Sequence, residues 1–406
     1  MPGRPLEGGR EAPDAVAPPP RHPRFPLFDG LRAIAVISVV ALHSWVAASG
    51  GYGESLPDRM LAHLNIGVTI FFVISGFLLY RPFIAHRAGG AEAPSVGDYA
   101  KRRILRIYPA YWLITTVMLI VPGLSGGPPS EPWHQYLLLD TPGLYGTTGC
   151  WSAPFDCGLA NTWSLVVELT FYVALPFYAI GFGWVLRKLA VRSWARTELA
   201  VLAALSALSF ALRFSGQAPF TSPWFAYSVL GTFYWFSLGM GLAVVSVGLA
   251  GSGSRAIAGL SRRPGALWIC AAALYAALAI LLPGTPFLFD RSDQAFNNLA
   301  FGAVALLLVA PAVLSGSVRG PVSRVLGNRL VAWIGLISYG IFLWHYAFTL
   351  KLDKSSTPFA VVFLLTLLAT IPCAAASYYL LERPILRLKY QRIRGLLKRR
   401  YDLEST

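Results

Sequence analysis

The sequence predicts an all-α protein, a polytopic membrane bundle of about ten transmembrane helices with both termini cytoplasmic. Its 406 residues are 55% hydrophobic and only 13% charged, whereas globular proteins carry about 25% charged residues. The mean hydropathy is +0.55. The apolar residues form long runs, which excludes an ordinary soluble enzyme, a disordered chain and a barrel of alternating strands.

Ten apolar runs approach the length of about 20 residues that a helix needs to cross the hydrocarbon core of a bilayer. Before them, residues 1–24 form a Pro-rich tail that we expect to be disordered, and residues 391–406 form a basic cytoplasmic tail. The first run carries an arginine and no clean cleavage site, which is typical of a signal anchor. The expected spans are 27–49, 63–82, 107–122, 161–184, 197–215, 223–248, 265–283, 295–314, 331–350 and 359–381.

The basic residues are distributed unevenly between the two sides of the membrane. Of 34 Lys and Arg, 28 lie in the tails and loops on the side of the termini, five lie on the other side, and Arg32 lies within the first span. Cytoplasmic loops carry such an excess, so both termini are predicted to be cytoplasmic. The same excess accounts for the net charge of +15, so we expect the lipid bilayer and no nucleic acid as a partner.

Two of the four cysteines, Cys150 and Cys157, fall in the longest predicted outer loop, 123–160. The outer face of a cell is oxidising, so we expect these two to form a disulfide, with two free thiols as the alternative. The other two cysteines lie in predicted spans and are interpreted as small apolar residues.

Three ionisable residues, His43, Glu168 and His345, are expected at a similar depth in the outer half of the membrane. Charges at membrane depth are costly and usually mark function. An imidazole with a carboxylate that orients it is suited to proton transfer. The alternative is that each residue forms an ordinary hydrogen bond between helices. No metal is predicted, because the three residues come from three helices without a local ligand spacing.

A second group of charges is expected near the cytoplasmic side. Arg103 and Arg106 are three residues apart and so share a helix face, and guanidinium groups suit bidentate phosphate binding. Arg32 lies eleven residues before His43, on the same helix face and about 16 Å away along the axis. By itself the charge pattern favours positive-inside anchoring, and the proximity of Arg32 makes a phosphate-bearing donor a reasonable second interpretation.

Six segments, in order along residues 25–390, resemble the acyltransferase 3 family of integral membrane acyltransferases. The resemblance includes the Arg-x10-His pair of the family's first helix, at Arg32 and His43. Phe342 is a departure, because the family often has Tyr there. The segments are FDGLRAIAVISVVALHS (28–44), GVTIFFVISGFLL (67–79), RILR (103–106), NTWSLVVELTFY (161–172), ISYGIFLWH (337–345) and SYYLLERP (377–384).

The resemblance implies a membrane acyltransferase domain over residues 25–390. It would transfer an acyl group, often acetyl, from acyl-coenzyme A to a hydroxyl of a carbohydrate-containing acceptor, with acyl-coenzyme A as co-substrate and no bound cofactor. By resemblance, His43 and Glu168 are catalytic, and the three arginines Arg32, Arg103 and Arg106 bind the donor. The hypothesis is that His43, oriented by Glu168, removes the acceptor's proton. A covalent acyl intermediate is the alternative mechanism. Supporting residues would come from Trp163, Ser164, Ser338, Tyr339 and His345, the first four as candidates for stabilising an oxyanion.

The alternative function is a proton-coupled transporter of a small or acylated solute. Ten helices and a buried histidine with a carboxylate also suit proton coupling. The sequence shows neither repeated halves nor paired broken helices, which transporters often have.

Overall fold

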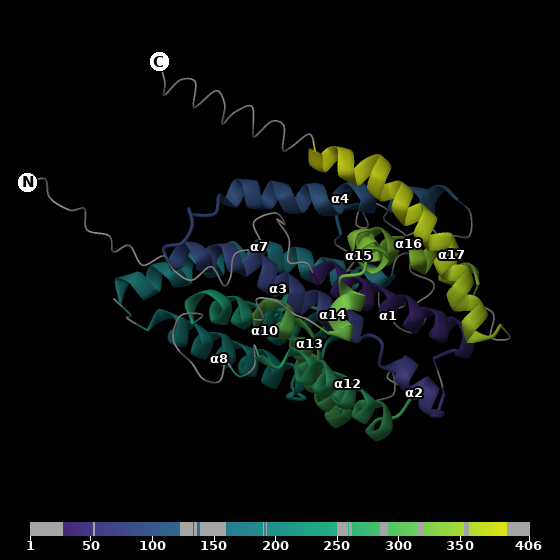
Figure 1. The fold of residues 1–406 in the computed structure, drawn as a ribbon, viewed down its shortest axis with the longest axis horizontal. Helices are drawn as coiled ribbons and strands as arrows, with labels where there is room; N and C mark the ends of the chain where they lie inside the picture. The colour runs from purple at the N-terminus through teal and green to yellow at the C-terminus, as the bar shows by residue number, and fades with distance from the viewer. Residues whose placement is uncertain are drawn as a thin grey trace, which may run out of the picture.

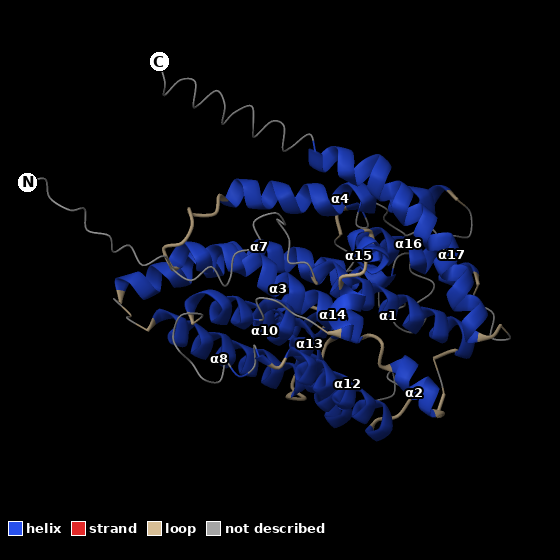
Figure 2. Cartoon of the chain, in the orientation of Figure 1, coloured by secondary structure: helices blue, strands red, loops and turns tan. Residues whose placement is uncertain are grey.

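The computed structural model describes residues 27–51, 53–121, 133, 136–138, 160–189, 191, 193–249, 259, 262–284, 291–314, 320–352 and 357–387. Within these ranges the regular structure is entirely helical (Figure 2). The predicted tails 1–24 and 391–406 and the candidate disulfide Cys150–Cys157 lie outside the described residues.

The helices run mostly back and forth along one direction, with α4 along the upper edge and α12 along the lower edge of the view (Figure 1). The elements are α1 (Phe28–Ser49), α2 (Leu56–Ala62), α3 (Ile66–Arg87), α4 (Val96–Ile120), η1 (Ala160–Thr162), α7 (Trp163–Lys188), α8 (Trp194–Phe214), α9 (Pro223–Ala226), α10 (Val229–Gly248), α12 (Pro264–Leu281), α13 (Arg291–Leu314), α14 (Pro321–Leu326), α15 (Arg329–Leu336), α16 (Ser338–Lys351), α17 (Phe359–Ser377) and the π-helical turn η3 (Tyr378–Glu382).

The prediction of a polytopic helical bundle is confirmed. In the described part of the chain, nine helices are long and apolar enough to cross a membrane. The ninth predicted span, 331–350, is instead a pair of helices, α15 and α16, that bend by 71° at Ile337. The pair passes the same test when its two helices are taken together, which raises the number to ten.

The third span begins eleven residues earlier than the sequence predicted, at Val96 instead of 107. Ser95 caps this helix, because its hydroxyl accepts a hydrogen bond from the backbone N–H of Asp98. The prediction was wrong because the first three turns of α4 are polar and the hydropathy criterion passed over them. Arg103 and Arg106 therefore lie within a helix and not at its start.

The centre of the bundle is tightly packed because glycines let two helix backbones meet. A Cβ on Gly76 of α3 would lie 2.1 Å from the carbonyl oxygen of Phe236 on α10. A Cβ on Gly239 of α10 would lie 2.0 Å from the carbonyl oxygen of Val73 on α3. Small residues allow such close approach between membrane helices. Helices α3 and α10 thus form one continuous layer, against which α1 and α13 also pack.

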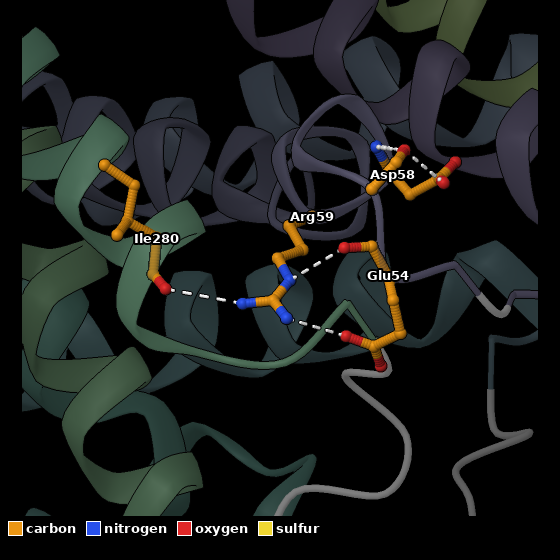
Figure 3. A network of polar contacts seen from close by, with 5 residues as sticks. Glu54, Asp58, Arg59 and Ile280 are labelled. Atoms are coloured by element: carbon orange, nitrogen blue, oxygen red, sulfur yellow. Dashed lines mark hydrogen bonds and ion pairs between the residues drawn. The ribbon is translucent and has the colours of Figure 1, made fainter.

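The short helix α2 is held against the ends of α1 and α12 by polar contacts, of which Figure 3 shows those of Arg59. Arg59 donates to the Glu54 carboxylate at 2.9 Å and to the carbonyl oxygen of Ile280, at the end of α12, at 3.4 Å. Asp58 accepts from the indole N–H of Trp45 on α1 at 3.0 Å. These contacts tie together three helix ends that are predicted to lie on the outer side.

Both termini are expected on the cytoplasmic side, because ten spans put them on the same side and that side then carries 28 basic residues against five on the other. The test is a background in which the four native cysteines are replaced by serine. Ser130→Cys should react with an impermeant reagent in intact cells, and Ser405→Cys only after lysis. Reaction of Ser405→Cys in intact cells would show that the bent pair α15–α16 does not cross the membrane.

Candidate functional site

One cavity, of about 90 Å³, lies among five helices that are far apart in the sequence. It has room for several water-sized groups. Its lining includes seven of the residues singled out from the sequence, and mostly apolar side chains of α3, α4, α7 and α16 complete it. The seven are Arg32 on α1, Arg103 and Arg106 on α4, Ser164 and Glu168 on α7, and Ser338 and Tyr339 on α16.

The basic side of the cavity is formed by the three arginines, which differ in their surroundings. Arg32 forms a salt bridge of 2.9 Å with Asp29, one turn away on α1. The guanidinium of Arg103 lies over the rings of Tyr99 and Tyr172, at 5.9 and 5.4 Å from their centroids. Its Nε is buried without a hydrogen-bond partner in the described part of the chain. Arg106 is exposed. This side of the cavity is therefore suited to an anionic ligand.

The acidic side of the cavity is Glu168. Its Oε1 accepts hydrogen bonds of 2.5 Å from the hydroxyls of Ser75 on α3 and Tyr172 on α7. Neither donor was singled out from the sequence. Tyr172 was predictable in part, because it lies four residues after Glu168 and so on the same helix face. Ser75 comes from another helix, and only the fold reveals it.

His43 and His345 form a pair between α1 and α16. Nδ1 of His43 lies 2.9 Å from Nε2 of His345, and the two rings are stacked with centroids 5.1 Å apart. Nδ1 of His345 lies 3.0 Å from the carbonyl oxygen of Ile341. His345 is fully buried, and His43 is partly exposed.

The structure describes no hydrogen bond between His43 and Glu168, which the sequence analysis expected to act as a unit. Helix α1 packs on α16, so His43 meets His345, whereas α7 packs on α3 and α4, so Glu168 meets Ser75. Phe342 connects the two groups, because it lines the cavity and its ring centroid is 5.9 Å from that of His345. The histidine pair thus adjoins the cavity through Phe342 and does not line it.

The four oxyanion candidates are not equivalent. Trp163 does not line the cavity; its ring packs edge-on against Tyr227 at 4.8 Å. The hydroxyl of Tyr339 donates to the carbonyl oxygen of Ile107 at 2.8 Å, so its proton is already used. Ser164 and Ser338 are buried at the cavity and are the remaining candidates; the hydroxyl of Ser164 donates only a long hydrogen bond of 3.4 Å, to the carbonyl oxygen of Asn161.

The fold and the site define an integral membrane protein with a basic cavity and an adjoining pair of imidazoles that can exchange a proton. The chain belongs to the acyltransferase 3 family, because the family model described as an acyltransferase domain matches residues 26–379. No solved structure matches the chain significantly.

Curated relatives are similar over most of this chain. A putative peptidoglycan O-acetyltransferase, YrhL of Bacillus subtilis, is 27% identical over 90% of this chain and 55% of its own length. The peptidoglycan O-acetyltransferase OatA of Listeria monocytogenes is 26% identical over 89% of this chain and 55% of its own length. Nodulation protein 10 of Rhizobium leguminosarum is 26% identical over 89% of this chain and 93% of its own length. The chain therefore spans about half the length of the first two relatives.

Proposed function

We propose that the protein is a multi-pass O-acyltransferase of the bacterial plasma membrane. It transfers an acyl group, acetyl in the simplest case, from acyl-coenzyme A to a hydroxyl of a carbohydrate-containing acceptor. The observation that carries the proposal is the cavity, in which three arginines and a carboxylate lie beside a histidine pair. The family match and the names of the peptidoglycan O-acetyltransferases support the reaction type and the acceptor class.

In the proposed reaction the donor's phosphates bind at Arg103 and Arg106, which form the more exposed side of the cavity. Its acyl thioester lies at the far end, near Phe342. Nε2 of His43 takes the proton of the acceptor hydroxyl while the oxygen attacks the thioester carbonyl. The carbon–sulfur bond then breaks, and the coenzyme A thiolate leaves and recovers the proton from His43. Ser164 or Ser338 donates to the oxyanion.

A transfer assay separates this function from proton-coupled transport. Purified protein in liposomes is given acetyl-coenzyme A labelled in its acetyl group, with and without a soluble glycan acceptor. An acyltransferase releases free coenzyme A and moves the label to the acceptor or to water. A transporter leaves the thioester intact, and that result would overturn the proposal.

Arg103→Ala combined with Arg106→Ala is expected to raise the KM for acetyl-coenzyme A at least about tenfold, because charge-assisted phosphate contacts are lost. The turnover number should change less, since neither side chain is among the described contacts of the histidine pair. Arg102→Ala is the matched control: it removes an exposed charge from the same helix that does not line the cavity. Equal effects of the control and the double variant would show that these arginines only anchor the helix.

A further inference from the structure

The hydrogen bonds of His345 determine which of its nitrogens carries a proton. Nδ1 of His345 lies 3.0 Å from the carbonyl oxygen of Ile341, and a carbonyl oxygen can only accept. Nδ1 therefore carries the proton and donates it. In a neutral imidazole the other nitrogen then holds a lone pair. Nε2 of His345 is thus an acceptor, and it faces Nδ1 of His43 at 2.9 Å.

The same reasoning extends to His43. Because Nε2 of His345 accepts, Nδ1 of His43 must be the donor and carries the proton. Nε2 of neutral His43 is then unprotonated and available as a base. The opposite direction would need a protonated imidazolium at His345, which is fully buried. Neither ring has a carboxylate among its contacts in the described part of the chain, so that charge would be costly.

We infer that His345 is a positioning residue, which holds His43 in the tautomer whose Nε2 is the base. The three groups form one chain of hydrogen bonds: His43 donates to His345, and His345 donates to the carbonyl oxygen of Ile341. When His43 takes a proton on Nε2, its Nδ1–H bond to His345 becomes charge-assisted and stabilises the imidazolium. Elsewhere a carboxylate fills this role for a catalytic histidine. Here a second imidazole backed by a backbone carbonyl fills it. The inference rests on the proposed function, in which His43 is the base.

The tautomers can be measured without any substrate. The test uses full-length protein labelled with ¹⁵N in its histidine rings, and ¹⁵N–¹H correlation spectra that distinguish the two neutral forms. His43→Gln and His345→Gln assign the signals. We expect the Nδ1–H form at both His43 and His345. A signal for His43 in the Nε2–H form would overturn the inference.

Kinetics of two His345 variants separate positioning from packing. His345→Leu fills the buried position with an apolar side chain but removes the nitrogen that accepts from His43. We therefore expect kcat to fall on the order of 10²-fold, with KM for the donor within about twofold. His345→Gln should recover most of that loss, because its Oε1 can accept the Nδ1–H of His43. Its spectrum should also retain the Nδ1–H form of His43.

The outcomes that contradict the inference differ from those that contradict the proposed function. Equal activity of His345→Leu and His345→Gln, normalised to folded protein, would mean that the acceptor nitrogen is irrelevant and would overturn the inference. A wild-type protein that never transfers the labelled acetyl group would instead overturn the proposed function.

Discussion

Replacing His43 with alanine is expected to lower acyl transfer by about 10²–10⁴-fold, the usual contribution of a general base. No other imidazole lies on α1, and His345 cannot take over, because its one unprotonated nitrogen is the acceptor that faces His43. Donor binding should persist, since the arginines and Glu168 of the cavity are unchanged. The measurement is the rate of transfer from labelled acetyl-coenzyme A in membranes, together with equilibrium binding of the donor.

His86→Ala is the matched control, because His86 is exposed at the end of α3 and remote from the cavity lining. It should leave transfer unchanged. A His43→Ala protein that folds, binds the donor and still transfers acyl groups at the wild-type rate would place the chemistry elsewhere, with Glu168 as the next candidate for the base.

The second large effect is expected on stability, at a buried ion pair outside the cavity. Glu198 of α8 is fully buried, forms a salt bridge with Arg87 of α3, and accepts hydrogen bonds from the hydroxyls of Tyr80 and Tyr178. Arg87 also donates to the carbonyl oxygen of Ala179 at 2.8 Å. Glu198→Ala leaves the largely buried guanidinium of Arg87 without a counter-ion, so we expect a loss of about 3–5 kcal/mol.

The measurement is the free energy of unfolding in detergent. Arg87→Met combined with Glu198→Met should be markedly more stable than Glu198→Ala, because the double variant leaves no unpaired charge. Glu92→Ala, at an exposed position, should lie within about 0.5 kcal/mol of the wild type. If Glu198→Ala matched Glu92→Ala, the pair would be solvated and would not hold the helices together.

The sequence was sufficient for the positions of the nine long apolar helices in the described part of the chain, because hydropathy and the rise of a helix determine them. It was insufficient for the direction in which each residue faces. His43, Glu168 and His345 are predicted to share a depth, but which two meet depends on how α1, α7 and α16 are packed. The bend at Ile337 also escaped prediction, although Gly335 and Gly340 flank it, because glycine is common in membrane helices and does not by itself indicate a break.

Gly239 lies outside the cavity lining, yet it controls the position of a residue inside it. A side chain at Gly239 would press on the carbonyl of Val73, and α3 would have to move away from α10. Ser75 is two residues further along α3, and its hydroxyl holds Glu168. Loss of activity on substituting this glycine would therefore resemble loss of a substrate contact. In a mutational survey of the protein, inactive variants on α10 need a structural probe before they are counted as part of the reaction centre.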